Sequence, residues 1–225
     1  ALIRFLPGKD LERLPFVMYK QHSFKFENGQ MFYSICPTSI GKPCPVCEAN
    51  RRLWQIDKDL ASKRNAKKQY VSNILVIKEL APIGDPENEG KIFKFVFGKQ
   101  VYGLLEAKLS PNSDLGEEPL VFFDFENGAD FQIQSVKQGD FPNYAVNSKF
   151  RAPSPIKKET HHLTIEEIYE KLWHQDDLFD FSSIPEYEEI QEKYHSLKNS
   201  NIDNSEFESK KKKTHKYNSP SQRKH

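Results

Sequence analysis

Short runs of alternating apolar and polar residues fill roughly the first 150 residues, and turn residues separate these runs. A period of two is typical of half-buried β-strands, and Asn28-Gly29 between two aromatic runs predicts a hairpin. We expect one helical interruption, at Cys47–Lys68. Many short strands with one interruption favour a small barrel over a doubly wound sheet. The predicted strands are Ala1–Leu6, Phe16–Tyr19, Met31–Ile35, Tyr70–Ile77, Lys91–Phe97, Leu120–Phe125 and Phe131–Val136.

The spacing of apolar residues changes after Ala152-Pro153-Ser154-Pro155, and this segment marks a boundary between two parts of the chain. Beyond it, apolar residues recur with helical spacing from Leu163 to Leu172. Thr164 and Glu167 stand where a capping box would begin this helix. A second helix is expected from Pro185 to Leu197. The C-terminal part is therefore predicted to be helical.

Charge divides the chain into three segments, although the net charge of the whole is only +1. Residues 1–150 carry 20 Lys/Arg and 18 Asp/Glu, residues 151–209 carry 6 and 14, and residues 210–225 carry 7 and 0. We therefore expect a core at 1–150, an acidic helical region at 151–209 and a basic tail at 210–225. The tail has no apolar periodicity, so we expect it to be disordered in isolation. The acidic region is a candidate to fold over the basic surface of the core.

Three closely spaced cysteines predict a metal site in a reducing compartment. Cys44-Pro45-Val46-Cys47 brings two thiolates to one ion, and Cys36 lies close enough to supply a third. Among seven histidines, only His22 lies in the strand-rich part, and the Asn28-Gly29 hairpin would bring it back to Cys36. A set of three Cys and one His without a carboxylate is typical of structural zinc. The alternative, a redox pair, needs a thioredoxin-like βαβ setting and leaves Cys36 unexplained.

Basic residues interleave with aromatic residues in three places, as a groove for single-stranded nucleic acid requires. The densest stretch follows the cysteines and comprises Arg51, Arg52, Lys58, Lys63, Arg64, Lys67 and Lys68, with Tyr70 next. A second cluster spans 91–99 and continues to Tyr102, and a third spans 141–151. Strand alternation places Phe93, Phe95 and Phe97 on one face and Lys94 on the other. At least two of these three rings are expected inside the core.

A series of short motifs follows one order along the first 150 residues and resembles one known family. The motifs are Ile3-Arg4-Phe5-Leu6-Pro7, the hairpin from His22 to Cys36, Cys44-Pro45-Val46-Cys47, Asn73-Ile74-Leu75-Val76, Pro86-Glu87-Asn88-Glu89-Gly90-Lys91, Phe97-Gly98-Lys99 and Asn143-Tyr144 with Ser148-Lys149-Phe150. In this order they resemble the single-stranded DNA-binding, helix-destabilising protein of T-even-type bacteriophages. From 151 to about 200 the likeness is one of length and helicity only.

The resemblance implies an α+β, mainly β fold, in which an OB-fold barrel carries a zinc subdomain at about 16–68 and C-terminal helices. It implies one structural Zn²⁺ held by His22, Cys36, Cys44 and Cys47. It further implies sequence-non-specific coating of single-stranded DNA in phage replication, recombination and repair, with removal of secondary structure. The implied partners are DNA, neighbouring copies and the phage's replication and recombination proteins, in the cytoplasm of an infected bacterium.

The predicted DNA-binding residues combine the basic and aromatic clusters with positions carried over from the family. Arg4, Tyr33, Tyr70, Phe95, Phe141 and Tyr144 match the family's cleft positions, as does the basic group around Arg64, Lys67 and Lys68. The full set is Arg4, Phe32, Tyr33, Arg51, Arg64, Lys67, Lys68, Tyr70, Phe93, Lys94, Phe95, Lys99, Tyr102, Phe141, Tyr144 and Lys149.

The chain departs from the family pattern in a few places. Val71 and Val96 stand where the family has an aromatic and a basic residue. The family's tail is acidic, whereas this chain ends in basic residues. Because the chain opens at Ala1 rather than Met, we expect residues before it, where the family carries a basic arm used in cooperative binding.

Other classes of function are weighed against DNA binding. A zinc-stabilised protein–protein interaction module of a replication complex would also use a metal turn and basic stretches. An enzyme is not expected, since the sequence shows no Walker loop, HExxH motif or paired-carboxylate set. No apolar run approaches the roughly 18 residues of a membrane helix, and no signal peptide opens the chain.

Overall fold

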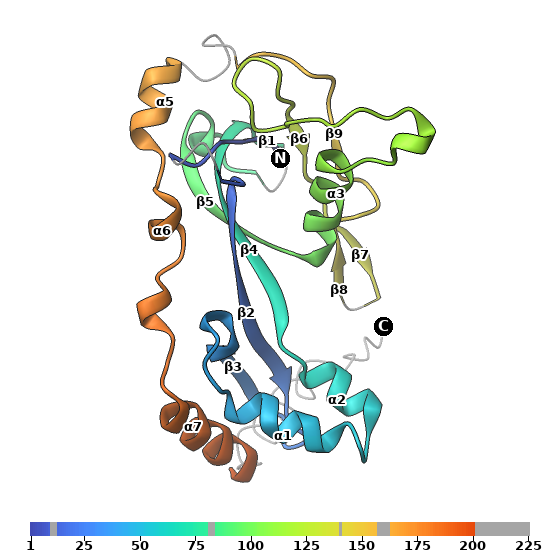
Figure 1. Cartoon of the computed structure of the whole chain (residues 1–225), viewed down its shortest axis with the longest axis vertical. Helices are drawn as coiled ribbons and strands as arrows, with labels where there is room; N and C mark the ends of the chain where they lie inside the picture. The colour runs from blue at the N-terminus through green and yellow to red at the C-terminus, as the bar shows by residue number, and fades with distance from the viewer. Residues whose placement is uncertain (10–12, 81–83, 140, 157–162, 201–225) are drawn as a thin grey trace, which may run out of the picture.

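The computed structural model describes residues 1–9, 13–80, 84–139, 141–156 and 163–200, and Figure 1 shows their arrangement. The molecule is elongated, with a sheet half at the top of the view and a hairpin half at the bottom. The strands are β1 Leu2–Phe5, β2 Phe16–Lys25, β3 Met31–Ile35, β4 Lys67–Lys78, β5 Ile92–Gly98, β6 Phe131–Gln132, β7 Val136–Gln138, β8 Phe141–Asn143 and β9 Lys149–Phe150. The α-helices are α1 Pro45–Leu53, α2 Lys58–Arg64, α3 Lys99–Leu109, α5 Ile165–Lys171, α6 Gln175–Leu178 and α7 Tyr187–Asn199. Short 3-10 turns lie at Pro37–Ile40, Pro86–Asn88, Ser113–Leu115 and Phe181–Ser183.

Strand β4 is the longest strand and belongs to both halves. On one edge it pairs with β2 through residues 67–72 and with β1 through residues 74–78, and on the other edge it pairs with β5. The order of the antiparallel sheet is β3-β2-β4-β1-β6-β9, while β7 and β8 form a separate hairpin. In the part of the chain that the structure describes, no ladder closes the sheet into a ring. The α+β class is confirmed, but the closed OB-fold barrel is not.

Local sequence patterns located most elements correctly. Met31–Ile35 is a strand with the predicted bounds, and Gly29 has a φ of 87°, which suits the turn after Asn28. The helical interruption is two helices, and Lys67 and Lys68, which were expected to end it, already belong to β4. Thr164 and Glu167 form the expected capping box at the start of α5.

Three expectations about the elements are wrong. Phe131–Val136 is not one strand, because β6 ends at Gln132 and Val136 begins β7. Leu120–Phe125 forms turns instead of a strand, because Phe122 is fully buried in the core and the Asp124 carboxylate accepts from the backbone of Glu126 and Asn127. The helix α3 was not expected at all. It forms because Val101 and Leu105, one helical turn apart, are both buried against the sheet.

Each half has its own aromatic core. In the sheet half, Phe5 lies at the centre, with its ring centroid 5.5–5.7 Å from those of Phe97, Phe122 and Phe131. In the hairpin half, Phe24, Phe26 and Phe32 pack together beside the cysteines. Much of the high aromatic content therefore serves packing.

Residues 163–200, which we call the strap, run along one side of the molecule and join the two halves (Figure 1). Ile168 and Leu172 pack with Leu6 and Leu75, and Leu178 packs with Tyr19 and Val71. On β4, Val71 and Leu75 face away from the side that carries Tyr70 and Ile74. The acidic strap therefore covers the outer face of the sheet, not the aromatic face over which it was expected to fold.

The end of the strap is fixed to the hairpin half. Ile190 and Tyr194 of α7 are buried among the hairpin's phenylalanines. The side-chain amide of Asn28 donates to the carbonyls of Leu197, Lys198 and Ser200, at the last turn of α7. The last carbonyls of a helix lack backbone N–H partners within it, so Asn28 of the hairpin turn caps the C-terminal end of α7.

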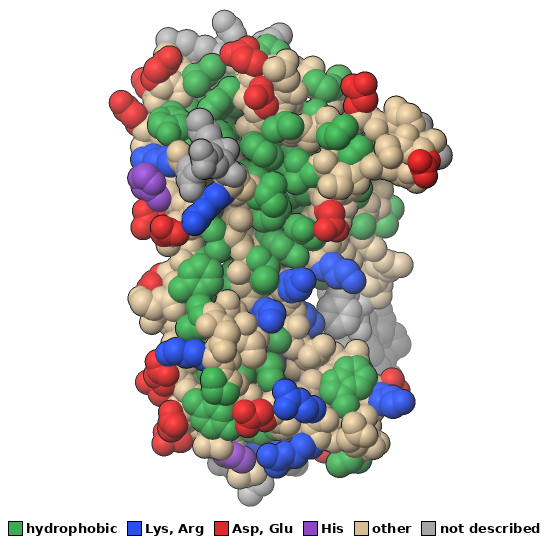
Figure 2. All heavy atoms as spheres, viewed as in Figure 1, with side chains coloured by type: hydrophobic (Ala, Val, Ile, Leu, Met, Phe, Trp, Pro, Cys, Tyr) green, Lys and Arg blue, Asp and Glu red, His purple; other side chains and the backbone are tan. Residues whose placement is uncertain are grey.

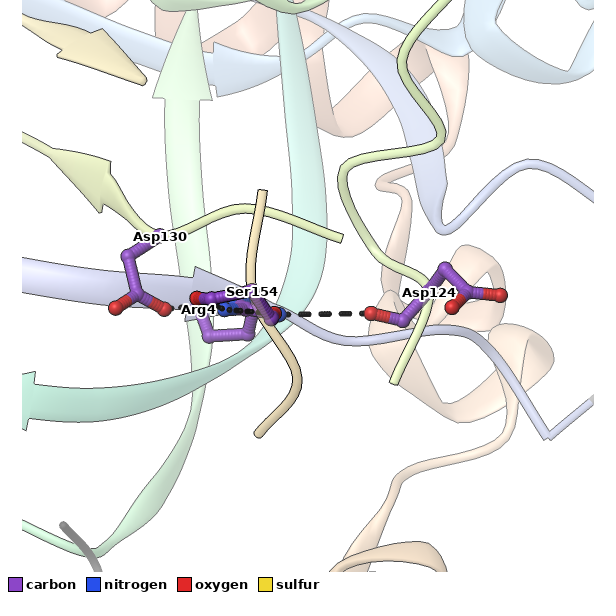
Figure 3. Close-up of polar contacts among 4 residues, drawn as sticks. All are labelled: Arg4, Asp124, Asp130 and Ser154. Carbon is purple, nitrogen blue, oxygen red and sulfur yellow. Dashed lines mark hydrogen bonds and ion pairs between the residues drawn. The ribbon is translucent and has the colours of Figure 1, made fainter. Parts of the chain in front are cut away.

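Arg4 links β1 to the loops that carry Asp124, Asp130 and Ser154, and its side chain is only 1% exposed. Figure 3 shows its guanidinium between Asp130, Ser154 and the backbone carbonyl of Asp124. Arg4 Nε lies 2.7 Å from the Asp130 carboxylate, and one terminal nitrogen donates to the Ser154 carbonyl. The prediction that Arg4 contacts DNA is wrong for this conformation, because all of its donors face protein.

We expect Asp130→Asn to lower the free energy of unfolding by about 2 kcal/mol, because it leaves the buried guanidinium of Arg4 without its counter-charge. Urea denaturation measures the change. Glu117→Gln, which neutralises an exposed carboxylate in the same half, is the control and should change stability by less than about 0.5 kcal/mol. Equal effects of the two substitutions would contradict a structural role for the Arg4–Asp130 pair.

Candidate metal centre and nucleic-acid interface

Four side chains converge where the β2–β3 hairpin meets the start of α1. His22 comes from β2, Cys36 follows β3, and Cys44 and Cys47 flank the first turn of α1, which begins at Pro45. Their ligand atoms all lie within 4.8 Å of one another. His22, Cys36 and Cys44 are buried, and Cys47 is half-buried. The predicted tetrad is therefore confirmed as a cluster.

The spacing of the four donors fits a tetrahedral ion. Cys36 Sγ lies 3.5 Å from Cys47 Sγ, and His22 Nε2 lies 3.5 and 3.4 Å from the sulfurs of Cys44 and Cys47. Ligands bound to one zinc at about 2.0–2.3 Å lie about 3.5–3.8 Å apart in a tetrahedron. Bonded disulfide sulfurs would lie only about 2.05 Å apart. The donor set thus fits a closed structural metal site.

Surrounding groups prepare the ligands for this role. His22 Nδ1 lies 3.1 Å from the backbone carbonyl of Arg64, which fixes the proton on Nδ1 and leaves Nε2 free to bind a metal. The Thr38 hydroxyl lies 3.1 Å from the sulfur of Cys36. Cys44 and Cys47 lie at the N-terminus of α1, where the helix dipole favours thiolates.

The pKa values of the tetrad show why it needs a cation. Burial lowers the pKa of His22, but hydrogen bonds to Cys36 and Cys44 outweigh this effect and raise it to about 9. Hydrogen bonds with Cys44 and Cys47 lower the pKa of Cys36, whereas hydrogen bonds with Cys36 and Cys44 raise that of Cys47. Ionisation of one thiol therefore opposes ionisation of the next, and a bound dication removes this opposition.

A stripe of basic and aromatic side chains crosses the middle of the molecule on one face of β2 and β4. Lys68 and Tyr70 share a face of β4, and Lys20 lies directly opposite Lys68 on β2. Lys67 and Lys68 are exposed, and among the described residues neither they nor Lys20 forms an ion pair. Figure 2 shows Lys and Arg gathered over the middle and lower part of this view, whereas acidic side chains follow the strap and the upper end.

Aromatic rings continue the stripe into the sheet half. Tyr102 stacks on Tyr70 with a centroid distance of 4.0 Å and an interplanar angle of 3°. Tyr70 then stacks on Phe97, and Phe97 on Phe95, each at 5.6 Å. Tyr70 and Phe97 are buried within this ladder, while Tyr102 and Phe95 are half-buried. Tyr102 and Phe95 are therefore the two rings of the ladder that reach the surface.

The phenols of the ladder stay neutral. Burial raises the pKa of Tyr70, and the nearby charge of Glu106 adds to it. Burial also raises the pKa of Tyr102, whose hydroxyl donates to Glu106 over 3.1 Å. A neutral phenol does not repel phosphate, so both rings remain suited to stacking beside a nucleic-acid backbone.

Other predicted positions lie at the surface. Tyr33 is 52% exposed on β3, where its hydroxyl donates to Gln21 on the face of the hairpin opposite to Lys20, and Phe93 is 37% exposed at the start of β5. Arg51, Lys99 and Lys149 are exposed, and Tyr144 is half-buried, with its backbone N–H donating to Gln100 at the start of α3. Phe141 begins β8, but its side chain lies outside the described residues. Their contacts with DNA remain predictions.

Three predicted contacts are turned away from this surface. Phe32 is fully buried and stacks on Phe24, so its ring is unavailable for a base. Lys94 lies on the strap face, where it contacts the Trp173 ring and the Asp177 carbonyl. Arg64 is 9% exposed, with its guanidinium over the rings of Phe24 and Phe26. Composition identified basic and aromatic residues, but it did not identify the face on which each lies.

Two residues of the stripe were missed. Lys20 stands opposite Lys68, and the Phe16 ring packs edge-on against Tyr70 and Tyr102. The predicted strand at Phe16–Tyr19 ended before the alternating residues that follow it. Extending it through Lys25 would have placed Phe16 and Lys20 on one face.

Comparison with known proteins supports these assignments. A family model described as "gp32 DNA binding protein like" matches residues 1–217. The "Single-stranded DNA-binding protein" of Enterobacteria phage T4 is 32% identical over 198 residues, which cover 86% of this chain and 64% of the relative. The protein of the same name from Enterobacteria phage T2 is 31% identical with the same coverage, so the chain spans just under two thirds of both relatives. The match to the family model establishes that the chain belongs to the gp32-like DNA-binding protein family.

Proposed function

We propose that the chain binds single-stranded DNA without sequence preference and coats it during phage DNA replication, recombination and repair. The observation that carries this proposal is the stripe in which Lys20 and Lys68 lead into the ladder of Tyr70 and Tyr102. The names of the relatives from phages T4 and T2 support the same ligand. The role is stoichiometric binding, with no chemical step assigned to it.

The paired lysines indicate an anionic ligand. Like charges directly opposite each other on neighbouring strands destabilise a sheet, and among the described residues no carboxylate pairs with Lys20 or Lys68. A phosphate between them offsets the repulsion and releases counterions from the DNA. Lys67, Arg51, Lys99 and Lys149 extend this basic surface.

The aromatic rings supply the preference for unpaired bases. Tyr102, Phe95 and Tyr144 are half-buried rings beside the stripe, Phe93 is exposed at the start of β5, and Tyr33 is exposed on the other face of the hairpin. Stacking of a base on an aromatic ring contributes about 1–3 kcal/mol and tolerates any base. A paired duplex cannot offer its bases in this way, so coating would also remove hairpins from the strand. Tyr70 stacks on Tyr102 within the ladder. Phe141 remains a proposed stacking partner for a base.

We further propose that the tetrad of His22, Cys36, Cys44 and Cys47 holds one structural Zn²⁺. The ion would hold the β2–β3 hairpin against α1 and so support the basic side of the DNA surface. Free thiols suit the reducing cytoplasm of an infected bacterial host. There the chain would associate with further copies along DNA and with the phage's replication and recombination proteins. No helix in the described parts of the chain has the length and apolar character of a membrane span.

Titration with poly-dT should quench tyrosine fluorescence, and the affinity should fall as salt rises. Duplex DNA of equal length, added as a competitor, should bind at least tenfold more weakly. A zinc-stabilised interaction module that lacks a DNA surface predicts no fluorescence change. Equal affinity for duplex and single strand would end the proposal of single-strand binding.

Lys20→Ala combined with Lys68→Ala should weaken poly-dT binding and reduce the slope of log K against log salt by about 1.4, since each phosphate contact on a single strand contributes about 0.7. Lys108→Ala combined with Lys171→Ala removes the same charge from exposed positions outside the stripe and serves as the control. If both double variants reduce the slope equally, net charge and not the stripe sets the affinity.

One zinc per chain is expected by elemental analysis, and Cys44→Ser should abolish it. Removing the ion with a chelator should unfold the hairpin half, because structural zinc contributes on the order of 10 kcal/mol to folding in small zinc domains. Hydrogen exchange at Ile190 of α7 should then accelerate, while exchange at Phe5 in the sheet half changes less. Restoring Zn²⁺ is the control. Unchanged exchange at Ile190 in the metal-free chain would contradict this role.

A further inference from the structure

A cavity of about 310 Å³ opens between α1, α2 and α7, in the hairpin half. Its apolar wall includes Val46, Leu53, Ile56 and Tyr194. Figure 1 shows these three helices gathered at the lower end of the molecule, beyond the β4 stripe. The cavity is separate from the metal ligands and from the aromatic ladder.

The lining of the cavity selects among ligand classes. Its apolar wall of Val46, Leu53, Ile56 and Tyr194 suits an apolar peptide side chain, and it does not suit a sugar–phosphate backbone.

Charge around the opening defines the peptide further. Arg52 and Lys198 stand exposed at the cavity together with His195, and Arg64 adds a buried positive charge. Among the described residues, none of these four side chains forms an ion pair. Ile56, 83% exposed beside them, extends the apolar wall to the surface. A cationic rim around an apolar hollow is complementary to carboxylates that flank a large apolar side chain.

We propose that the cavity between α1, α2 and α7 is a docking site for an acidic peptide segment of a partner protein, which inserts one aromatic or aliphatic side chain between Leu53, Ile56 and Tyr194. The flanking carboxylates pair with Arg52 and Lys198, which stand exposed at the cavity. The site gives the chain a way to hold a protein partner while the stripe on β2 and β4 holds DNA.

The test uses the full chain and a fluorescein-labelled peptide of sequence GDEFDEG, with binding followed by fluorescence anisotropy. The unmodified chain binds the peptide. Arg52→Glu combined with Lys198→Glu weakens binding at least tenfold, and so does Ile56→Asp, which alters a largely exposed side chain and leaves the fold intact. Replacing the phenylalanine of the peptide with serine has a similar effect.

The control variant is Lys108→Glu combined with Lys171→Glu, which makes the same charge change at exposed positions of α3 and α5. It retains peptide binding. Poly-dT affinity, measured on all variants at one salt concentration, is equal in the cavity variant and in this control. That comparison keeps the peptide site distinguishable from the DNA surface.

Three results overturn the docking site: no binding of GDEFDEG to the unmodified chain, equal loss of peptide binding in the cavity and control variants, or a greater loss of poly-dT affinity in the cavity variant. The last result assigns the cavity to DNA instead.

Discussion

The pairing of β4 along both of its edges is the constraint on which the rest of the structure depends. Its first half pairs with β2 and its second half with β1, so one strand carries the register of both halves of the molecule. Alternation along β4 then separates two functions. Lys68 and Tyr70 point to the basic and aromatic stripe, while Val71 and Leu75 point to the strap. A shift of register by one residue would exchange the two sets.

The hairpin half depends on a second constraint, the convergence of four metal-binding side chains from three separate elements. The tetrad lies against the phenylalanine cluster of the hairpin, and α7 closes that cluster with Ile190 and Tyr194. Metal binding, hairpin geometry and docking of α7 are therefore linked. The backbone carbonyl of Arg64 orients His22 while the guanidinium of the same residue lines the α1–α2–α7 cavity, so one residue contributes to both sites.

Features set by local sequence were predictable, whereas features set by distant contacts were not. The Asn28-Gly29 turn, the strand at Met31–Ile35 and the capping box of Thr164 depend on near neighbours, and all were located correctly. The tetrad was predictable because cysteine spacing and a single nearby histidine leave few choices. Arg4 was misassigned because its partner Asp130 is 126 residues away. The helix α3 was missed because a strand pattern and a helix pattern both fit its apolar residues until the packing of Val101 and Leu105 is known.

The strap has a consequence for how the molecule meets a flexible strand. Its α5 is anchored on the sheet half, α6 packs against β2 and β4 through Leu178, and α7, capped by Asn28, is anchored on the hairpin half. The distance between the two halves is therefore set when the chain folds rather than when ligand arrives. A surface that is ordered in advance loses less conformational entropy on association, so more of each stacking and phosphate contact appears as affinity. The strap, by covering the outer face of the sheet, thus preorganises the molecule from the side that faces away from the basic and aromatic stripe.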